Sequence, residues 1–214
     1  MAWTLTNADI ISALPLLADH YEKADSGSDT QLVCTRLTNL VNSEVVGATI
    51  AFVNGDNAGS DAVVTSYSSG SGTLGFAQLS NAVNNQTGFG IVYISYQVFI
   101  DRAYDIIANE MRNKGIDVDL FLTTSHVKEL HLTKTIELVC LSKRHNADAD
   151  DIYHESYLVF KEKYEKEVTT LKADYDLDED GTIDEDIEEK VSAQVRLIRW
   201  LHYWVIMVID IQIS

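Results

Sequence analysis

The sequence predicts an α+β fold, with a helical bundle of three to four helices, a small antiparallel β-barrel or sandwich insertion, and an extended C-terminal arm. Between residues 31 and 97, short runs of β-branched and aromatic residues alternate with spacers rich in glycine and asparagine, which is typical of short strands and turns. Beyond residue 98, apolar residues recur every three or four positions, as they do on one face of a helix. The last fifteen residues are apolar and nearly uncharged, which indicates the arm.

The first thirty residues precede the strand-rich region, and we expect a helical segment there. The apolar cluster that begins at Ile10 can start a helix after Thr6 or Asn7, but Pro15 interrupts it. A proline inside a helix costs about 3 kcal/mol. Residues 1–30 are therefore expected to hold one short helix or two pieces, followed by a loop at residues 25–29.

Five runs within the β-rich insertion, residues 31–97, are the expected strands. They are VCTRLTNLV, EVVGATIAFV, DAVVTSY, GTLGFAQL and GFGIVYISY. Short strands at this spacing favour antiparallel pairing in a small barrel or sandwich. The glycines of GSGTLG and GFG have strand-forming residues on both sides. We therefore expect hairpin turns there and not a phosphate-binding loop, which would lead into a helix.

Residues 98–199 are expected to form the helical bundle. The first helix is predicted over 99–114, the second over 126–145 after an N-cap at Ser125, the third from residue 151, and a shorter fourth over 187–199. The predicted inward faces are Phe99, Ala103, Ile106, Ile107 and Met111 in the first helix, Val127, Leu130, Ile136, Val139 and Cys140 in the second, and Tyr153, Tyr157, Phe160, Tyr164, Val168, Leu171 and Tyr175 in the third.

The composition limits what the chain can bind. Its 214 residues include 33 acidic and 16 basic side chains, for a net charge of −17. Sequence-specific nucleic-acid binding needs basic residues against phosphate, so that class of function is not expected. An acidic surface keeps a protein soluble, or lets DNA slide past because like charges repel.

The cysteines and the N-terminus indicate a reducing compartment. Cys34 and Cys140 each lie in an apolar run, which indicates buried thiols and not a disulfide or a metal pair. The N-terminal stretch MAWTLTNAD has no basic region followed by an apolar core. We therefore expect no secretory signal and synthesis in the cytoplasm.

An acidic loop within the predicted bundle carries the most specific motif. Its candidate metal ligands are Asp176, Asp178, Asp180, Thr182 and Asp184. With Gly181 at the turn, their spacing matches positions one to nine of a calcium loop of the EF-hand kind. Position twelve, where a bidentate carboxylate should close the cage, is Ile187. We therefore expect weak calcium binding, on the order of a hundred micromolar or weaker; the alternative is an acidic, solvated turn without metal.

No catalytic motif is apparent, so we do not expect an enzyme. The sequence contains no GxSxG, HExxH or GxxxxGK[ST] pattern. His126 and His131 are five residues apart, a spacing that does not place them on one helix face, and neither has a cysteine at zinc-like spacing. The chain has many acidic residues, and the sequence marks no two of them as a catalytic pair.

The C-terminal arm, residues 200–214, is the expected contact with a partner. It is shorter than the roughly twenty apolar residues that cross a membrane, so no membrane span is expected. We expect it to become ordered as an added strand on another chain or in a partner's groove; the alternative is a core strand of its own domain. The candidate partner-binding residues are Trp200, Tyr203, Trp204, Val205, Ile206, Val208, Ile209, Ile211 and Ile213.

Four stretches, in this order, resemble the head-to-tail adaptor, or connector, proteins of tailed bacteriophages. They are SYSSGSGTLGF, NKGIDVDLFL, SHVKELHLTKTIELVC and YHESYLVFKEKYEKEVTTLKADYDLDEDGTID, and the resemblance covers most of residues 43–199. It implies a virion structural protein that forms a homo-oligomeric ring of twelve copies beneath the portal protein, in the neck of the particle, after assembly in the host cytoplasm.

The same resemblance implies the partners of such a ring. The C-terminal segment would dock on the portal, a tail or neck protein would bind the other side, and DNA would pass through the channel without sequence-specific binding. The family has no catalytic motif, so the resemblance assigns no active-site residue.

A calcium-dependent adhesion or docking module is the alternative function. Such a module would fold around the loop at residues 176–184 and bind a surface protein or a glycan. It accounts for the acidic loop and the strand-rich half, but not for the apolar arm, and it would be expected to carry a secretion signal. The adaptor predicts a ring or a portal-dependent oligomer, the adhesion module a calcium-stabilised monomer, and an enzyme a pocket with perturbed titratable groups.

Overall fold

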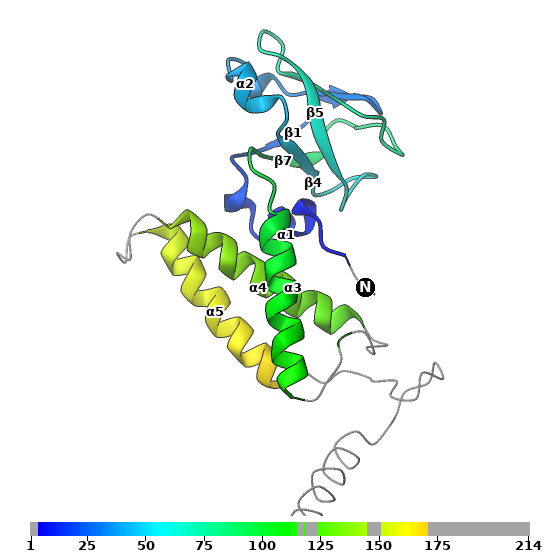
Figure 1. Ribbon diagram of the computed structural model, residues 1–214. Coiled ribbons are helices and arrows are strands. Elements are labelled where there is room, and N and C mark those ends of the chain that lie inside the picture. Colours follow the sequence, from blue (N-terminus) through cyan, green and yellow to red (C-terminus); the bar gives the residue numbers. More distant parts are fainter. Residues whose placement is uncertain (1–3, 115–117, 119–123, 145–150, 171–214) are drawn as a thin grey trace, which may run out of the picture.

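The computed structural model of the protein describes residues 4–114, 118, 124–144 and 151–170. A curled β-sheet lies at one end and three long helices lie at the other, with a short helix between them (Figure 1). The helices are α1 (Asn7–Ala13), α2 (Asn42–Val45), α3 (Gln97–Asn113), α4 (Thr124–Lys143) and α5 (Ile152–Thr170), with short 3-10 turns η1 (Pro15–Leu17) and η2 (Thr35–Leu37). The strands are β1 (His20–Lys23), β2 (Ser26–Gly27), β3 (Gln31–Val33), β4 (Thr49–Phe52), β5 (Asp61–Ser68), β6 (Thr73–Phe76) and β7 (Gly88–Val92).

The N-terminal segment forms two helical pieces, the second of the two alternatives expected there. The Thr6 hydroxyl accepts the Asp9 N–H and the Asp9 carboxylate accepts the Thr6 N–H, which is a capping box at the start of α1. Pro15 opens η1, where a proline needs no hydrogen-bond donor. The predicted loop at residues 25–29 was partly wrong, because Ser26–Gly27 forms β2. The strand β1 just before it was also missed.

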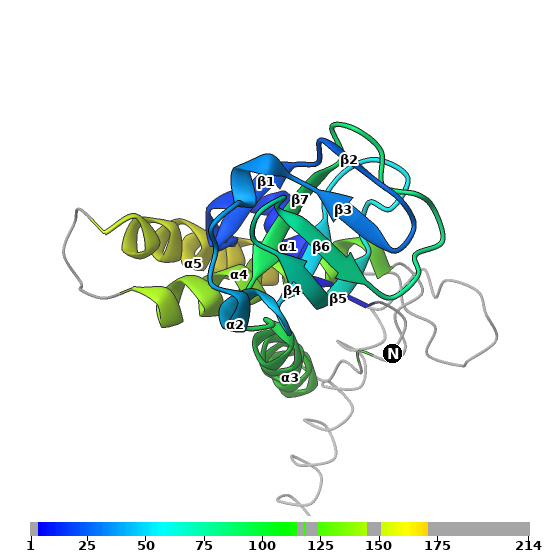
Figure 2. The same ribbon diagram turned by 90° about the horizontal axis from the view of Figure 1, so that it is seen from above.

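All strand pairs are antiparallel, as predicted, and the order in the sheet is β1-β7-β4-β5-β6-β3-β2. The two edge strands, β1 and β2, are separated in the chain by only Ala24 and Asp25. Ala24 donates its N–H to Thr87 beside β7, and Asp25 donates its N–H to Val33 of β3. One continuous segment therefore joins both edges, and the sheet curls into a half-barrel (Figure 2).

Four of the five predicted strands are shorter than expected, and two of these runs contain helical turns. The run 33–41 leaves β3 after Val33 and turns into η2, and the run 44–53 begins in α2 and becomes a strand only at Thr49. Positive φ angles at Asn39 (71°) and Gly47 (94°) reverse the chain inside these runs.

The two glycine motifs differ from each other. GSGTLG turns the chain between β5 and β6, which confirms the hairpin expected there. GFG lies inside β7, so the turn predicted at that motif was wrong. A Cβ atom on Gly90 would lie 2.8 Å from Ile11 of α1. The glycine is needed because the helix packs directly on the strand.

The three long helices confirm the predicted bundle, with α4 in the middle. It contacts α3 on one side and α5 on the other (Figure 1), and eight of its residues from His131 to Cys140 are buried. All five residues of its predicted inward face are buried. Because α4 begins at Thr124, Ser125 lies inside the helix and not at the predicted N-cap.

The helices on either side of α4, α3 and α5, bury the faces predicted for them, with one difference in α3. In α3, three residues of the predicted face are buried: Ala103, Ile107 and Met111. Phe99 and Ile106 of that face are only partly buried, and Ile100 is buried in the first turn instead. In α5 the predicted side chains from Tyr153 to Val168 pack on the core. Leu171, Tyr175 and the expected fourth helix lie outside the described residues.

Three hydrophobic clusters follow one another along the molecule. The first fills the half-barrel and includes Phe52 and Phe76, whose rings meet edge to face. The second lies between α1, the sheet and the bundle, and the third lies among the far halves of α3, α4 and α5. Cys34 and Cys140 are buried free thiols, as predicted. None of the helices in the described parts is long and apolar enough to cross a lipid bilayer.

Candidate functional site

The candidate residues that the sequence singles out lie outside the described part of the chain. The predicted calcium ligands, Asp176, Asp178, Asp180, Thr182 and Asp184, and the predicted arm, residues 200–214, all fall within 171–214. Their roles stay predictions. Two features of the described residues take their place as candidates: the joint between sheet and bundle, and a cavity beside α3.

Asn7 is the centre of the joint. Its backbone N–H and its side-chain Nδ2 both donate to Asp61 Oδ2 of β5, each at 2.8 Å, and Ala8 donates its N–H to Asp61 Oδ1 at 2.9 Å. The Asn7 side-chain oxygen accepts the Tyr96 N–H at 2.8 Å. One side chain thus connects α1, β5 and the start of α3, and the Asp61 carboxylate lies at the positive end of α1.

Burial raises the pKa of Asp61, although the hydrogen bonds from Asn7 and Ala8 work in the opposite direction. A buried carboxylate needs several donors to remain ionised. The three N–H groups from the start of α1 supply them. The Asp61 carboxylate therefore depends on α1 for its hydrogen-bond donors. The first N–H groups of α1 in turn depend on Asp61 as their acceptor.

Further contacts connect the bundle to the chain before β1. The Tyr96 hydroxyl donates to the Leu17 carbonyl at 2.6 Å, and Lys143 Nζ donates to the same carbonyl at 3.1 Å. Lys143 also reaches Asp19 Oδ1 at 3.3 Å. Burial alone would lower the pKa of Lys143, but its contacts with Tyr96 and Asp19 raise it. Polar bonds and the second hydrophobic cluster together tie the sheet to the bundle.

A polar cluster joins the three helices at the far half of the bundle. Lys134 Nζ lies 2.9 Å from Glu137 Oε2, and their side chains are only 13% and 7% exposed. The same ammonium lies 4.3 Å from the centre of the Tyr164 ring, and the Tyr164 hydroxyl donates to Glu110 Oε2 at 2.7 Å. The cluster takes one or two residues from each helix, so it favours one register of the bundle.

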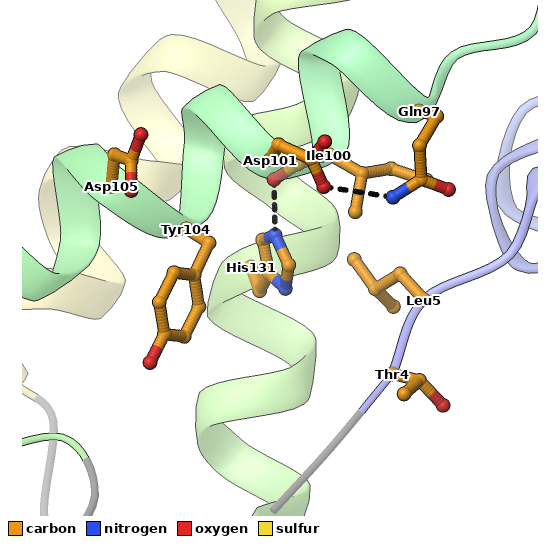
Figure 3. Close-up of a pocket in the computed structure, with 8 residues that line it drawn as sticks. All are labelled: Thr4, Leu5, Gln97, Ile100, Asp101, Tyr104, Asp105 and His131. Atoms are coloured by element: carbon orange, nitrogen blue, oxygen red, sulfur yellow. Dashed lines mark hydrogen bonds between the residues drawn. The ribbon is translucent and has the colours of Figure 1, made fainter. Parts of the chain in front are cut away.

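A cavity of about 450 Å³ opens where the N-terminal segment, α3 and α4 meet. Its lining residues are Thr4, Leu5, Gln97, Ile100, Asp101, Tyr104, Asp105 and His131. Figure 3 shows His131 in the middle of the lining, with Leu5 and Tyr104 on opposite sides of it. The inner wall is apolar and aromatic, while Asp101 and Asp105 are exposed at the rim.

His131 is fixed in position and 1% exposed. Its Nε2 lies 2.7 Å from the Ile100 carbonyl oxygen (Figure 3). A carbonyl can only accept, so this nitrogen carries a hydrogen. Burial lowers the pKa of His131, opposed by the hydrogen bond to Ile100 and by the charge of Asp101. The imidazole is therefore neutral at neutral pH, and it contributes no positive charge to the cavity.

The rim carries the charge of the cavity. Asp101 and Asp105 are four residues apart in α3, one turn of the helix. Gln97 Nε2 donates to Asp101 Oδ1 at 2.8 Å. Neither acid forms a salt bridge within the described residues. The arrangement can receive a positively charged group at the rim and an apolar group inside.

The cavity was not predicted from the sequence. His131 was weighed there only as a possible metal ligand with His126, whereas it lines the cavity and is held by the Ile100 carbonyl. No three His, Cys, Asp or Glu side chains come together as a metal site in the part of the chain that the structure describes. The available signal was the spacing of Asp101, Tyr104 and Asp105, which places acidic and aromatic groups on one side of a helix.

Several large apolar side chains are exposed on the surface. Ile94, which lies between β7 and α3, is 77% exposed, and Val98 in the first turn of α3 is 72% exposed. Ile152, Leu158 and Val159 of α5 are exposed by half or more.

Comparison with known proteins identifies no relative. No protein-family model matches the sequence, and no curated protein or solved structure matches it either.

Proposed function

We propose that this chain is a virion structural protein, a head-to-tail adaptor that forms a ring between the portal and the tail of a bacteriophage. The observation that carries the proposal is the order of parts. A half-barrel is followed by a bundle of three long helices, and the joint at Asn7 and Asp61 connects the two. A helical bundle with a β insertion is the architecture implied by the sequence resemblance.

The charge of the chain supports a role beside DNA. Its 33 acidic residues against 16 basic ones give a surface that repels a polyanion. A channel wall must let DNA move without holding it, and an acidic ring meets that requirement. DNA would therefore pass without sequence-specific contacts.

Exposed apolar side chains support contacts between copies in a ring. Ile94 and Val98 lie close in the chain to Tyr96 of the joint, and Ile152 and Val159 are exposed residues of α5. A ring places two different surfaces of each subunit against its neighbours. Apolar residues on separate helices would supply such a pair of surfaces.

The apolar arm supports an anchor on the portal. Residues 200–214 contain nine β-branched or aromatic candidates for partner contacts, and such a segment is suited to pairing with another chain.

The experiment that tests the anchor compares two forms of the chain. The full chain and a form that ends at Arg199 would each be mixed with purified portal rings and recovered by pull-down on the portal. The proposal expects the full chain to be recovered and the shortened chain to be lost, with circular dichroism showing that both are folded. Equal recovery of the two forms would refute an anchor at residues 200–214.

The acidic loop also favours the second candidate, a calcium-dependent adhesion or docking module. Five of its oxygen-bearing residues match a calcium loop in spacing. That function predicts a monomer that ignores the portal and is stabilised by calcium, so the same pull-down with and without calcium separates the two candidates.

A further inference from the structure

We propose that the cavity beside α3 takes the Trp3 side chain of the same chain, so that the N-terminal segment forms a strap across α3 and α4. The benzene ring of the indole would lie against the inner wall, and the indole N–H would lie at the rim. This inference does not depend on the ring or on the portal anchor, because it uses only the cavity and the residue next to its lining.

The chain brings Trp3 to the mouth of the cavity. Thr4 and Leu5 both line it, and Trp3 precedes Thr4, so their Cα atoms lie about 3.8 Å apart. Thr4 is exposed, Leu5 is 6% exposed, and Thr6 has extended backbone angles (φ −120°, ψ 165°). Successive side chains of an extended segment point to opposite sides. Trp3 would therefore lie on the same side of the segment as Leu5, which faces the cavity (Figure 3).

The inner wall suits an aromatic ring. Tyr104 and His131 meet edge to face, with ring centroids 6.0 Å apart, and Leu5 and Ile100 add apolar surface. A third aromatic ring would extend this pair, since aromatic side chains favour offset and edge-to-face contacts. The cavity volume of about 450 Å³ lies within the range of pockets that hold small ligands, roughly 300 to 1,000 Å³. An indole therefore fits without displacing the wall.

The polar rim suits the one polar group of the indole. The indole N–H can only donate a hydrogen bond, and a buried tryptophan usually finds an acceptor for it. Within the side chain this N–H lies close to Cβ, at the end that would stay near the mouth, where Asp101 and Asp105 offer carboxylate oxygens. A tryptophan that enters ring first has the same division as the lining, with its apolar end inside and its donor at the rim.

Such a strap would add to the contacts that fix the start of α1. Asn7 binds Asp61 of β5, and Lys128 of α4 donates to the Asp9 carboxylate at 3.2 Å. Trp3 in the cavity would add contacts with α3 and with a second site on α4. The cavity would then belong to the joint between sheet and bundle, and it would not be open to a diffusible ligand.

Acrylamide quenching of Trp3 fluorescence tests the proposal on the full chain without any portal. The sequence has three tryptophans, Trp3, Trp200 and Trp204, so W200F/W204F leaves Trp3 as the only one. The same chain with W3F and Y21W is the exposed reference, because Tyr21 of β1 is 43% exposed. Acrylamide is neutral, so the net charge of −17 does not bias its access to either tryptophan.

Variants of the wall locate the protection. Y104A removes one side of the cavity, and Y157A is the matched control, since both tyrosines are partly buried in the bundle. Circular dichroism checks that each variant keeps its helices, and I100A repeats the test of the wall if Y104A does not.

The proposal expects the quenching constant of Trp3 to be severalfold smaller than that of the Y21W reference. Y104A should raise it towards the value in the urea-unfolded chain, and Y157A should leave it unchanged. Equal quenching of Trp3 and the Y21W reference would overturn the proposal and leave the cavity open to an apolar group of a partner. Protection that survives both Y104A and I100A would also overturn it, because Trp3 would then be buried elsewhere.

A mixture of two chains separates Trp3 of the same chain from Trp3 of a second copy. The W200F/W204F chain with Y104A supplies the tryptophan, and an excess of W3F/W200F/W204F supplies intact cavities without tryptophan fluorescence. The two are unfolded together and refolded. The proposal expects the same quenching as for the Y104A chain alone, because the strap belongs to its own chain. Recovered protection would overturn it in favour of an exchange of Trp3 between copies.

Discussion

Asn7 donates two N–H groups, one from its backbone and one from its side chain, to the same oxygen of Asp61, each at 2.8 Å. The two residues lie on α1 and β5, far apart in sequence. Because the Asn7 side chain also accepts the Tyr96 N–H, this pair determines how the half-barrel is attached to the bundle.

Replacing Asn7 with alanine removes the bond to Asp61 from Nδ2 and leaves the buried Tyr96 N–H without its acceptor. Each unsatisfied buried group costs about 1–3 kcal/mol, so we expect the free energy of unfolding to fall by about 2–4 kcal/mol. Urea denaturation at one fixed protein concentration measures it. Asn85→Ala, at an exposed loop position, is the control and should change the value by less than about 0.5 kcal/mol. A similar small change for Asn7→Ala would mean that the joint does not depend on it.

His131 predicts a specific pH dependence. Because burial lowers its pKa below 6.5 in the folded chain, the unfolded chain binds a proton more readily. Stability is therefore lost as the pH falls from 6.5 towards the lower folded pKa, by up to about 1.4 kcal/mol per pH unit. His131→Gln removes this titration while keeping an N–H donor. The difference in unfolding free energy between the two proteins should shrink or reverse between about pH 7.5 and pH 5.5; parallel curves would contradict the assignment.

The Tyr164 hydroxyl should contribute to the stability of the bundle. Tyr164→Phe removes its hydrogen bond to Glu110, which is worth about 1–2 kcal/mol because the acceptor is a carboxylate and the site is partly buried. Tyr153→Phe is the control, since the hydroxyl of Tyr153 has no hydrogen bond within the described residues. A double-mutant cycle with Glu110→Gln measures the coupling. A coupling energy near zero would show that the two side chains act separately.

Gly90 should not tolerate a side chain. A Cβ atom there would lie 2.8 Å from Ile11 and 3.0 Å from Ala18, so Gly90→Ala should lower the free energy of unfolding by about 1–3 kcal/mol through crowding between α1 and β7. Gly70→Ala is the matched control, because a Cβ at Gly70 has no atom within 4 Å. Thermal unfolding measures the melting temperatures of both variants, and that of Gly90→Ala should be the lower. Equal melting temperatures would show that α1 can move away from the strand.

Calcium binding at residues 176–184 is expected to be weak. Isothermal titration calorimetry of the full chain should show binding on the order of a hundred micromolar or weaker. Asp176→Asn combined with Asp180→Asn should remove the signal, because the two changes take away two carboxylates of the proposed cage. If the unmodified chain releases or absorbs no heat with calcium at millimolar concentration, the calcium site is refuted and the loop is an acidic, solvated turn without metal.

The sequence predicted those parts of the fold that depend on local pattern. Periodic apolar residues located α3, α4 and α5, and runs of β-branched and aromatic residues located β4, β5, β6 and β7. The strand β1 was missed because its sequence, HYEK, has no β-branched residue. It becomes a strand through its pairing with β7, which no local signal contains.

The candidate cavity could not be predicted for a similar reason. Leu5 and His131 are far apart in sequence, and they meet only because α1 packs against both the sheet and α4. The shift in α3, where Ile100 and not Phe99 is buried, also depends on a contact between helices, because His131 of α4 binds the Ile100 carbonyl. Periodicity identifies the stripe on a helix, but the neighbouring helix selects which edge of that stripe is buried.

The proposed ring is tested most directly by native mass spectrometry of the full chain, alone and mixed with portal rings. The adaptor predicts either a closed oligomer whose mass is a multiple of 23.9 kDa, or a monomer that joins the portal in many copies. Addition of calcium should leave that assembly in place. A chain that stays a 23.9 kDa monomer in the presence of the portal would contradict the adaptor, and its stabilisation by calcium would favour the docking module.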